Sequence, residues 1–203
     1  MKSKAIFSSV IFFFVFFLPM RLSTPSAKTP AQKEETQYHQ QVEGLVTEAM
    51  NQLKKGNLEK AVELLQEAMI IIQGNQEFKV REIVLCSEIN GFRDYVKKTG
   101  NVIKTEEPLL LYIEPVGFRV LRKNAEFFIW LSEDASIIDE NGEAVFERTN
   151  WVNFNKGFPN PSIPFFITNR VTDIPPGNYT FRFTLKDHYK KTFLTDSFEF
   201  IVE

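Results

Sequence analysis

Two successive stretches of the chain carry apolar residues at helical spacing, so each places one apolar stripe along a helix. The first stripe consists of Val42, Leu45, Val46, Ala49, Met50 and Leu53. The second consists of Leu58, Ala61, Val62, Leu65, Ala68, Met69 and Ile72. Gly56-Asn57 separates them as a turn, and we expect Gly74 to end the second helix as a cap. The pattern predicts a helical hairpin over residues 37–74.

Beyond residue 76 the pattern changes to the alternation of strands. Near the C-terminus, apolar and polar residues alternate from Tyr179 to Lys186, which predicts an antiparallel strand with one buried face. Asn141-Gly142 predicts a hairpin turn. The expected strands are 81–88, 109–114, 126–131, 144–149, 164–168, 179–186 and 198–202. About seven to eight short strands between turn signals predict a mainly β protein, with an immunoglobulin-like antiparallel β-sandwich over residues 77–203.

The N-terminal segment differs from both of these patterns. Lys2 and Lys4 precede an apolar run over residues 5–18, and small residues follow it. This run is shorter than the roughly 17–25 residues of a membrane-spanning helix. We therefore predict a secretory signal peptide over residues 1–27, and an exported mature chain in the periplasm, cell envelope or medium. Residues 28–36 lack apolar periodicity and predict a disordered tether.

The charge balance is mildly acidic, with 24 Lys and Arg against 26 Asp and Glu. Loss of residues 1–27 would remove three basic residues and make the mature chain more acidic. We therefore predict no nucleic-acid partner, and contact with a membrane only through an uncleaved leader. Cys86 is the single cysteine, so it cannot form an intramolecular disulfide, and we expect a buried thiol.

The segment VTEAMNQLKKGNLEKAVELLQEAM resembles one tetratricopeptide repeat. Ala49 matches the small residue of its first helix, Gly56 the turn, and Ala61, Leu65 and Ala68 the packing positions of its second helix. Arrays of this family need about three repeats to bury their faces. The resemblance therefore implies a helical hairpin that packs against something else.

The segment DIPPGNYTFRFTLKD resembles the penultimate strand of immunoglobulin- and fibronectin-like modules in exported bacterial proteins, with Tyr179 as the corner tyrosine. The series LCSEINGF, EPLLLYIEPVGF, IIDENGEAV and PPGNYTFRF is similar to a group of uncharacterised exported bacterial proteins. This likeness implies the fold and carries no particular activity.

Aromatic residues in the segment WVNFNKGFPNPSIP are candidates for ligand contact. Trp151, Phe154 and Phe158 alternate with glycine and prolines, and exposed rings could stack on sugars or hold a peptide. In the alternative, which we favour, the rings point into the sandwich while the prolines shape an edge loop.

Four consecutive apolar residues in the second helix are candidates for an interaction surface: Met69, Ile70, Ile71 and Ile72. They place apolar groups round most of the helix, so we expect this surface to be covered. The cover could be the β-domain, which we rank first, a second copy of the chain, or a different protein.

Signals for catalysis or metal binding are weak. Neither His39 nor His188 belongs to a sequence motif with metal-ligand spacing, and no cofactor, metal site or catalytic group is predicted. An acidic cluster could offer oxygen ligands to calcium, but it lacks the loop of an EF-hand, so we expect a solvated hairpin tip. Its members are Glu133, Asp134, Asp139, Glu140, Asn141 and Glu143.

Together these patterns predict a non-catalytic exported protein that acts through protein–protein contacts or self-association of the helical hairpin. The alternative is a ligand- or polysaccharide-binding β-sandwich module of the cell envelope, which would use the aromatic residues from Trp151 to Phe158. An enzyme ranks third, because no acid–base or nucleophile arrangement is recognisable.

Overall fold

The computed structural model describes residues 30–124 and 126–203, with side chains from residue 37 onward. The predicted signal peptide over residues 1–27 lies outside the described residues and stays a prediction. Two helices, α1 (Pro30–Lys54) and α2 (Leu58–Asn75), form the N-terminal hairpin. No helix in the described part of the chain is long and apolar enough to cross a membrane.

Helix α1 begins earlier than the sequence predicted. It starts at Pro30, so the prediction of a disordered tether over residues 28–36 is wrong from residue 30 onward. Proline is favoured in the first helical position, because its fixed φ suits the helix and its missing N–H has no partner there. The residues that follow, mostly Ala, Gln, Lys and Glu, favour helix without any apolar stripe.

Helix α2 also differs at its end, because Gly74 lies inside it rather than in the left-handed cap that we predicted. The helix continues to Asn75, and Gln76 follows in an extended conformation. Gly74 is buried, and a Cβ placed there would lie 3.7 Å from Arg119 Nε. This is an ordinary van der Waals distance, so neither helix termination nor close packing requires glycine at this position.

Most of the buried residues of the two helices are small. Ala49, Ala61 and Ala68 are almost completely buried, together with Leu64. Small residues let two helix backbones approach closely, so the buried line is narrower than the predicted stripes. The large apolar side chains beside it remain exposed: Val46, Met50, Leu53, Leu58, Val62, Leu65 and Ile72.

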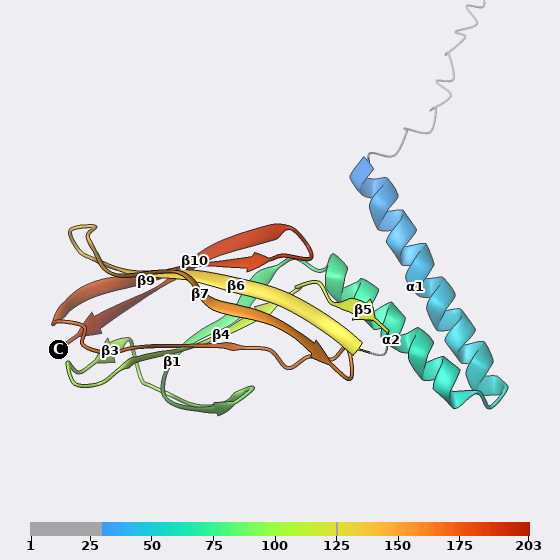
Figure 1. Cartoon of the computed structure of the whole chain (residues 1–203), viewed down its shortest axis with the longest axis horizontal. Coiled ribbons are helices and arrows are strands. Elements are labelled where there is room, and N and C mark those ends of the chain that lie inside the picture. The colour runs from blue at the N-terminus through green and yellow to red at the C-terminus, as the bar shows by residue number, and fades with distance from the viewer. Residues whose placement is uncertain (1–29, 125) are drawn as a thin grey trace, which may run out of the picture.

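Ten strands in the described residues form two sheets (Figure 1). The four-stranded sheet has the order β2-β1-β4-β8. Its strands are β1 (Lys79–Gly91), β2 (Asp94–Lys97), β4 (Leu109–Val116) and β8 (Ile167–Val171). The six-stranded sheet has the order β3-β10-β9-β6-β5, with β7 paired to β6. Its strands are β3 (Val102–Ile103), β5 (Leu121–Lys123), β6 (Glu126–Asp139), β7 (Ala144–Phe158), β9 (Gly177–Asp187) and β10 (Thr192–Val202).

The predicted fold class, a mainly β sandwich with an N-terminal α-hairpin, is confirmed. All strand pairs are antiparallel except that β3 lies parallel to β10. The count exceeds the predicted seven to eight because β2, β3 and β5 have only four, two and three residues. Strands this short contain too few residues for the alternation of apolar and polar positions to be recognised in the sequence.

The main core lies between the two sheets. The alternation in β9 is as predicted: Tyr179, Phe181, Phe183 and Leu185 are all buried. The hairpin lies at one end of the sandwich, with α2 on the side of the strands, and the C-terminus lies at the far end (Figure 1). Ile70 packs against the sandwich core, and Arg122 in β5 donates a hydrogen bond of 2.9 Å to Glu63 in α2.

Candidate functional site

The aromatic candidates lie in strand β7, and the prolines of the same segment follow the end of this strand. Trp151, Phe154 and Phe158 are half-buried and pack along the margin of the sandwich core. The Trp151 ring meets Phe146 edge-on at 5.0 Å, and Phe154 contacts Phe165 at 4.9 Å between ring centroids. The rings therefore belong largely to the packing of the sandwich.

The four residues of the candidate interaction surface in α2 do not share one environment. Ile70 packs against the sandwich core, and Met69 and Ile71 are half-buried. Ile72 is exposed. The β-domain thus covers part of this surface.

The acidic cluster is split between the core and the hairpin tip. Asp139 holds the tip, because it accepts hydrogen bonds from the backbone N–H groups of Asn141 and Glu143. Glu133, by contrast, is completely buried, so its prediction as part of a solvated tip is wrong. Strand β6 runs on to Asp139, past the predicted end at Leu131, and its alternation turns Glu133 inward with Leu131 and Ala135. No group of metal-ligating side chains occurs among the described residues.

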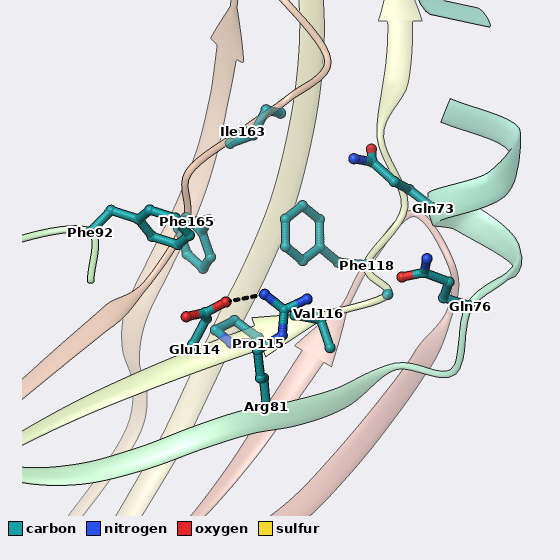
Figure 2. A pocket seen from close by; sticks show the side chains of 11 residues that line it. Gln73, Gln76, Arg81, Phe92, Glu114, Pro115, Val116, Phe118, Ile163 and Phe165 are labelled. Carbon is teal, nitrogen blue, oxygen red and sulfur yellow. Dashed lines mark hydrogen bonds and ion pairs between the residues drawn. The ribbon is translucent and has the colours of Figure 1, made fainter. Parts of the chain in front are cut away.

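A pocket of about 160 Å³ lies where the end of α2 meets the end of β4 (Figure 2). Helix α2 and the residues just after it contribute two amide side chains, Gln73 and Gln76. Strand β1 contributes Arg81. Three aromatic rings, Phe92, Phe118 and Phe165, join Ile163 in the apolar part of the wall. The remaining lining comes from the end of β4 and the residue after it, Glu114, Pro115, Val116 and Gly117.

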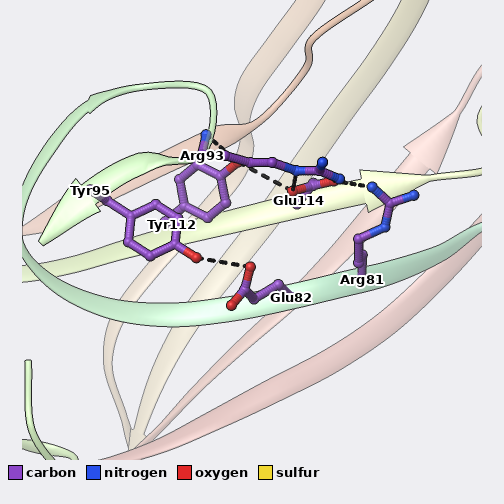
Figure 3. A network of polar contacts seen from close by, with 6 residues as sticks. All are labelled: Arg81, Glu82, Arg93, Tyr95, Tyr112 and Glu114. Carbon is purple, nitrogen blue, oxygen red and sulfur yellow. Dashed lines mark hydrogen bonds and ion pairs between the residues drawn. The ribbon is translucent and has the colours of Figure 1, made fainter. Parts of the chain in front are cut away.

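The polar centre of this site is the carboxylate of Glu114, which two arginines share (Figure 3). Arg81 Nη1 donates to Oε1 at 2.6 Å. Arg93 donates through Nη2 to Oε1 at 2.8 Å and through Nε to Oε2 at 3.0 Å. The Glu114 side chain is almost fully buried, whereas both guanidinium groups are half exposed. The cations therefore lie between a buried anion and the solvent.

A tight turn and a buried tyrosine position Arg93 over Glu114. Arg93 lies between β1 and β2 with φ of 56°, a left-handed conformation that folds the chain back over the sheet. Its backbone N–H donates to the Tyr112 hydroxyl at 3.2 Å, and that hydroxyl donates to Glu114 at 3.4 Å. Tyr112 is itself fixed by stacking on Phe166 at 5.2 Å.

Electrostatics keep Glu114 ionised despite its burial. Hydrogen bonds from Arg93 lower its pKa, burial acts in the opposite direction, and the charges of Arg93 and Arg81 lower it further. The neighbouring Tyr95 hydroxyl donates to Glu82 at 2.9 Å, which raises the pKa of Tyr95 to about 12. Two guanidinium groups thus face the buried carboxylate of Glu114, and Glu82 supplies a second carboxylate in the same network (Figure 3).

Sequence reasoning missed this site because its parts are distant along the chain. Arg81 and Arg93 precede Glu114 by 33 and 21 residues. One signal was present: Glu114 stands inside an otherwise apolar strand, where a charged residue needs a partner. The sequence alone could not say which partner it has.

Comparisons with known proteins do not assign this chain to a family. No protein-family model matches the chain, and no curated protein does. Among solved structures, one match is the Pseudomonas fluorescens alkylpurine DNA glycosylase AlkC bound to DNA containing an abasic site analog. It is 14% identical with a TM-score of 0.33, over 74% of this chain. The match spans about two fifths of the glycosylase chain, 39%.

This neighbour is a DNA-binding enzyme, which runs counter to three of our predictions. These are a non-catalytic role through protein contact, a chain that is not an enzyme, and the absence of a nucleic-acid partner. They find no support in the comparisons and are not retained. At a TM-score of 0.33 the likeness assigns no activity to this chain either. The tetratricopeptide and immunoglobulin-like resemblances stay predictions.

Proposed function

We propose that the pocket between α2 and β4 binds a small organic anion, and that the guanidinium group of Arg81 holds its carboxylate. One observation carries the proposal: Arg81 is a second arginine on Glu114, whose carboxylate is already bound at two points by Arg93. Arg93 alone makes a two-point contact with Glu114, which is the strongest arrangement for such a pair. Arg81 therefore adds a cation beyond what the buried charge requires.

The donors of Arg81 support this role. A guanidinium group has five N–H donors in a rigid fork, and Glu114 engages Arg81 through Nη1. The side chain is half exposed and lines the pocket. Its remaining donors are of the kind that binds a carboxylate at two points.

The other residues that line the pocket suit the uncharged part of a small organic anion. Phe92, Phe118 and Phe165 offer apolar faces, while Gln73 and Gln76 offer amide groups that fix orientation. Drug-sized ligands occupy roughly 300–1,000 Å³. The smaller volume of about 160 Å³ here favours a ligand of few heavy atoms.

The test is a calorimetric titration of the protein with benzoate, and separately with inorganic phosphate. We expect saturable benzoate binding with a dissociation constant on the order of 1 mM, because a ligand this small has little area to bury. Arg81→Gln should weaken benzoate binding at least about tenfold, equivalent to about 1.4 kcal/mol. Its stability should change by no more than about 1 kcal/mol, because the exposed half of the pair is solvated and Arg93 still holds Glu114.

Arg170→Gln is the matched control, because Arg170 is exposed on β8 of the same sheet and lies outside the pocket lining. It should bind benzoate as the unmodified protein does. Tighter binding of phosphate than of benzoate would show that the apolar wall plays no part. Absence of saturation with both probes, or equal loss in both variants, would refute the proposal.

A further inference from the structure

A second buried carboxylate, Glu133, lies in the sandwich core with a partner that is also buried. Glu133 on β6 and Asn169 on β8 come from the two different sheets, and both are completely inaccessible to solvent. Asn169 Nδ2 donates a hydrogen bond of 2.6 Å to Glu133 Oε1. The other oxygen of each group, Glu133 Oε2 and Asn169 Oδ1, has no hydrogen-bond partner among the described residues.

The neighbouring strands place no cation against this pair. Glu133 is in register with Leu185 on β9 and Val152 on β7, and Asn169 is in register with Leu111 on β4. No Lys, Arg or His is among the fully buried side chains of the described residues. An ionised Glu133 would therefore be a buried charge without a counter-ion, which is strongly unfavourable.

The titratable groups nearest along the strands are themselves acidic or point away. Asp134 follows Glu133 on β6 and pairs with Lys186, and its charge disfavours a second negative charge at Glu133. Asp187, buried on β9, accepts backbone N–H groups of Arg119, Tyr189 and Lys190. On the other sheet, Arg170 of β8 is exposed, and Glu114 of β4 binds its two arginines on the outer face.

A protonated carboxyl group resolves both unpaired oxygens at once. The neutral acid has an O–H donor, whereas the ionised form only accepts hydrogen bonds. An acid and a primary amide can form a closed pair with two parallel hydrogen bonds, amide N–H to one acid oxygen and acid O–H to the amide oxygen. The existing contact is the first of these bonds, and the two unpaired oxygens are the atoms that the second would join.

We propose that Glu133 is held protonated in the folded protein and forms a closed acid–amide pair with Asn169 that joins the two sheets, so that loss of its proton weakens the sandwich. The proton passes to solvent, and the ionised group keeps only the hydrogen bond from Asn169. The pair thus couples the stability of the fold to pH. This device is independent of the anion pocket.

The direction of the pH effect follows from the pKa of Glu133. Burial is the main cause that raises this pKa, from its ordinary value of 4.5 to about 7; the charge of Asp134 adds to it and the Asn169 hydrogen bond opposes it. Between these two values the folded chain keeps a proton that the unfolded chain has lost. The stabilisation is therefore complete below about pH 4.5 and is lost as the pH rises through about 7.

Glu133→Gln is the decisive variant, because glutamine has nearly the shape of the protonated acid and can donate the same hydrogen bond at every pH. Urea unfolding would be measured from about pH 5 to about pH 8. In the unmodified protein, the unfolding equilibrium constant should gain up to about tenfold per pH unit from this group below pH 7. Glu133→Gln should lose that contribution, and Glu147→Gln, an exposed carboxylate on β7, should keep it.

Carbon-13 NMR of the Glu133 carboxyl group in the unmodified protein gives a second readout that does not depend on the variant folding. We expect its resonance to titrate close to pH 7. A titration near 4.5, or an unchanged pH dependence in a folded Glu133→Gln, would overturn the proposal. If the variant does not fold, the NMR titration alone decides.

Discussion

Phe181→Ala is expected to lower the free energy of unfolding by about 3–5 kcal/mol. Phe181 is completely buried in β9 between the two sheets, and its ring lies 5.8 Å from that of Phe183. Removing the ring forfeits its transfer from water and leaves a cavity that the surrounding strands fill only in part. Urea unfolding followed by circular dichroism would measure the change.

Phe193→Ala is the control, since it removes the same atoms from a ring on β10 that is 71% exposed. Its effect should stay within about 0.5 kcal/mol. Similar midpoints for the two variants would show that the inward face of the β9–β10 hairpin has been assigned wrongly.

Gly117→Ala is expected to cost on the order of 2–4 kcal/mol. Gly117 has φ of 72°, a left-handed conformation that disfavours any residue with a Cβ. A Cβ there would also lie 2.0 Å from the backbone carbonyl oxygen of Glu77, in the segment that leaves the helical hairpin. The atoms that this Cβ would meet belong to the backbone of Gln76 and Glu77, so the junction between hairpin and sandwich must move.

Gly100→Ala separates the two causes. Gly100 has a similar φ of 78°, but nothing lies within 4 Å of the position of its Cβ. We expect a cost of about 1–2 kcal/mol, from conformation alone. Gly117→Ala should in addition weaken benzoate binding, because Gly117 lines the anion pocket. Equal thermal midpoints for the two variants would contradict the close contact with Glu77.

Several elements were predictable because their signals are local. Alternation from Tyr179 to Lys186 set both the strand and its buried face, and Asn141-Gly142 marked the turn between β6 and β7. Local composition also explains the early start of α1, where helix propensity rather than apolar periodicity is the signal.

The charged interior was far less predictable. Arg81, Arg93 and Glu114 meet only because β1 pairs with β4 while the turn before β2 folds back over their sheet. The pairing of Glu133 with Asn169 requires the two sheets to face each other. Glu and Asn are usually found at the protein surface, so their residue types alone do not predict burial.

The sequence by itself determined the two-helix start, the sandwich class and the inward face of the β9 strand. Each of these depends on a period of 3.6 or 2 that neighbouring residues establish together. The tertiary structure alone decided which charges are buried, which cation partners which carboxylate, and where the anion pocket lies. Burial and pairing depend on groups that come together from distant parts of the chain, and a local sequence pattern does not show which distant residues will meet.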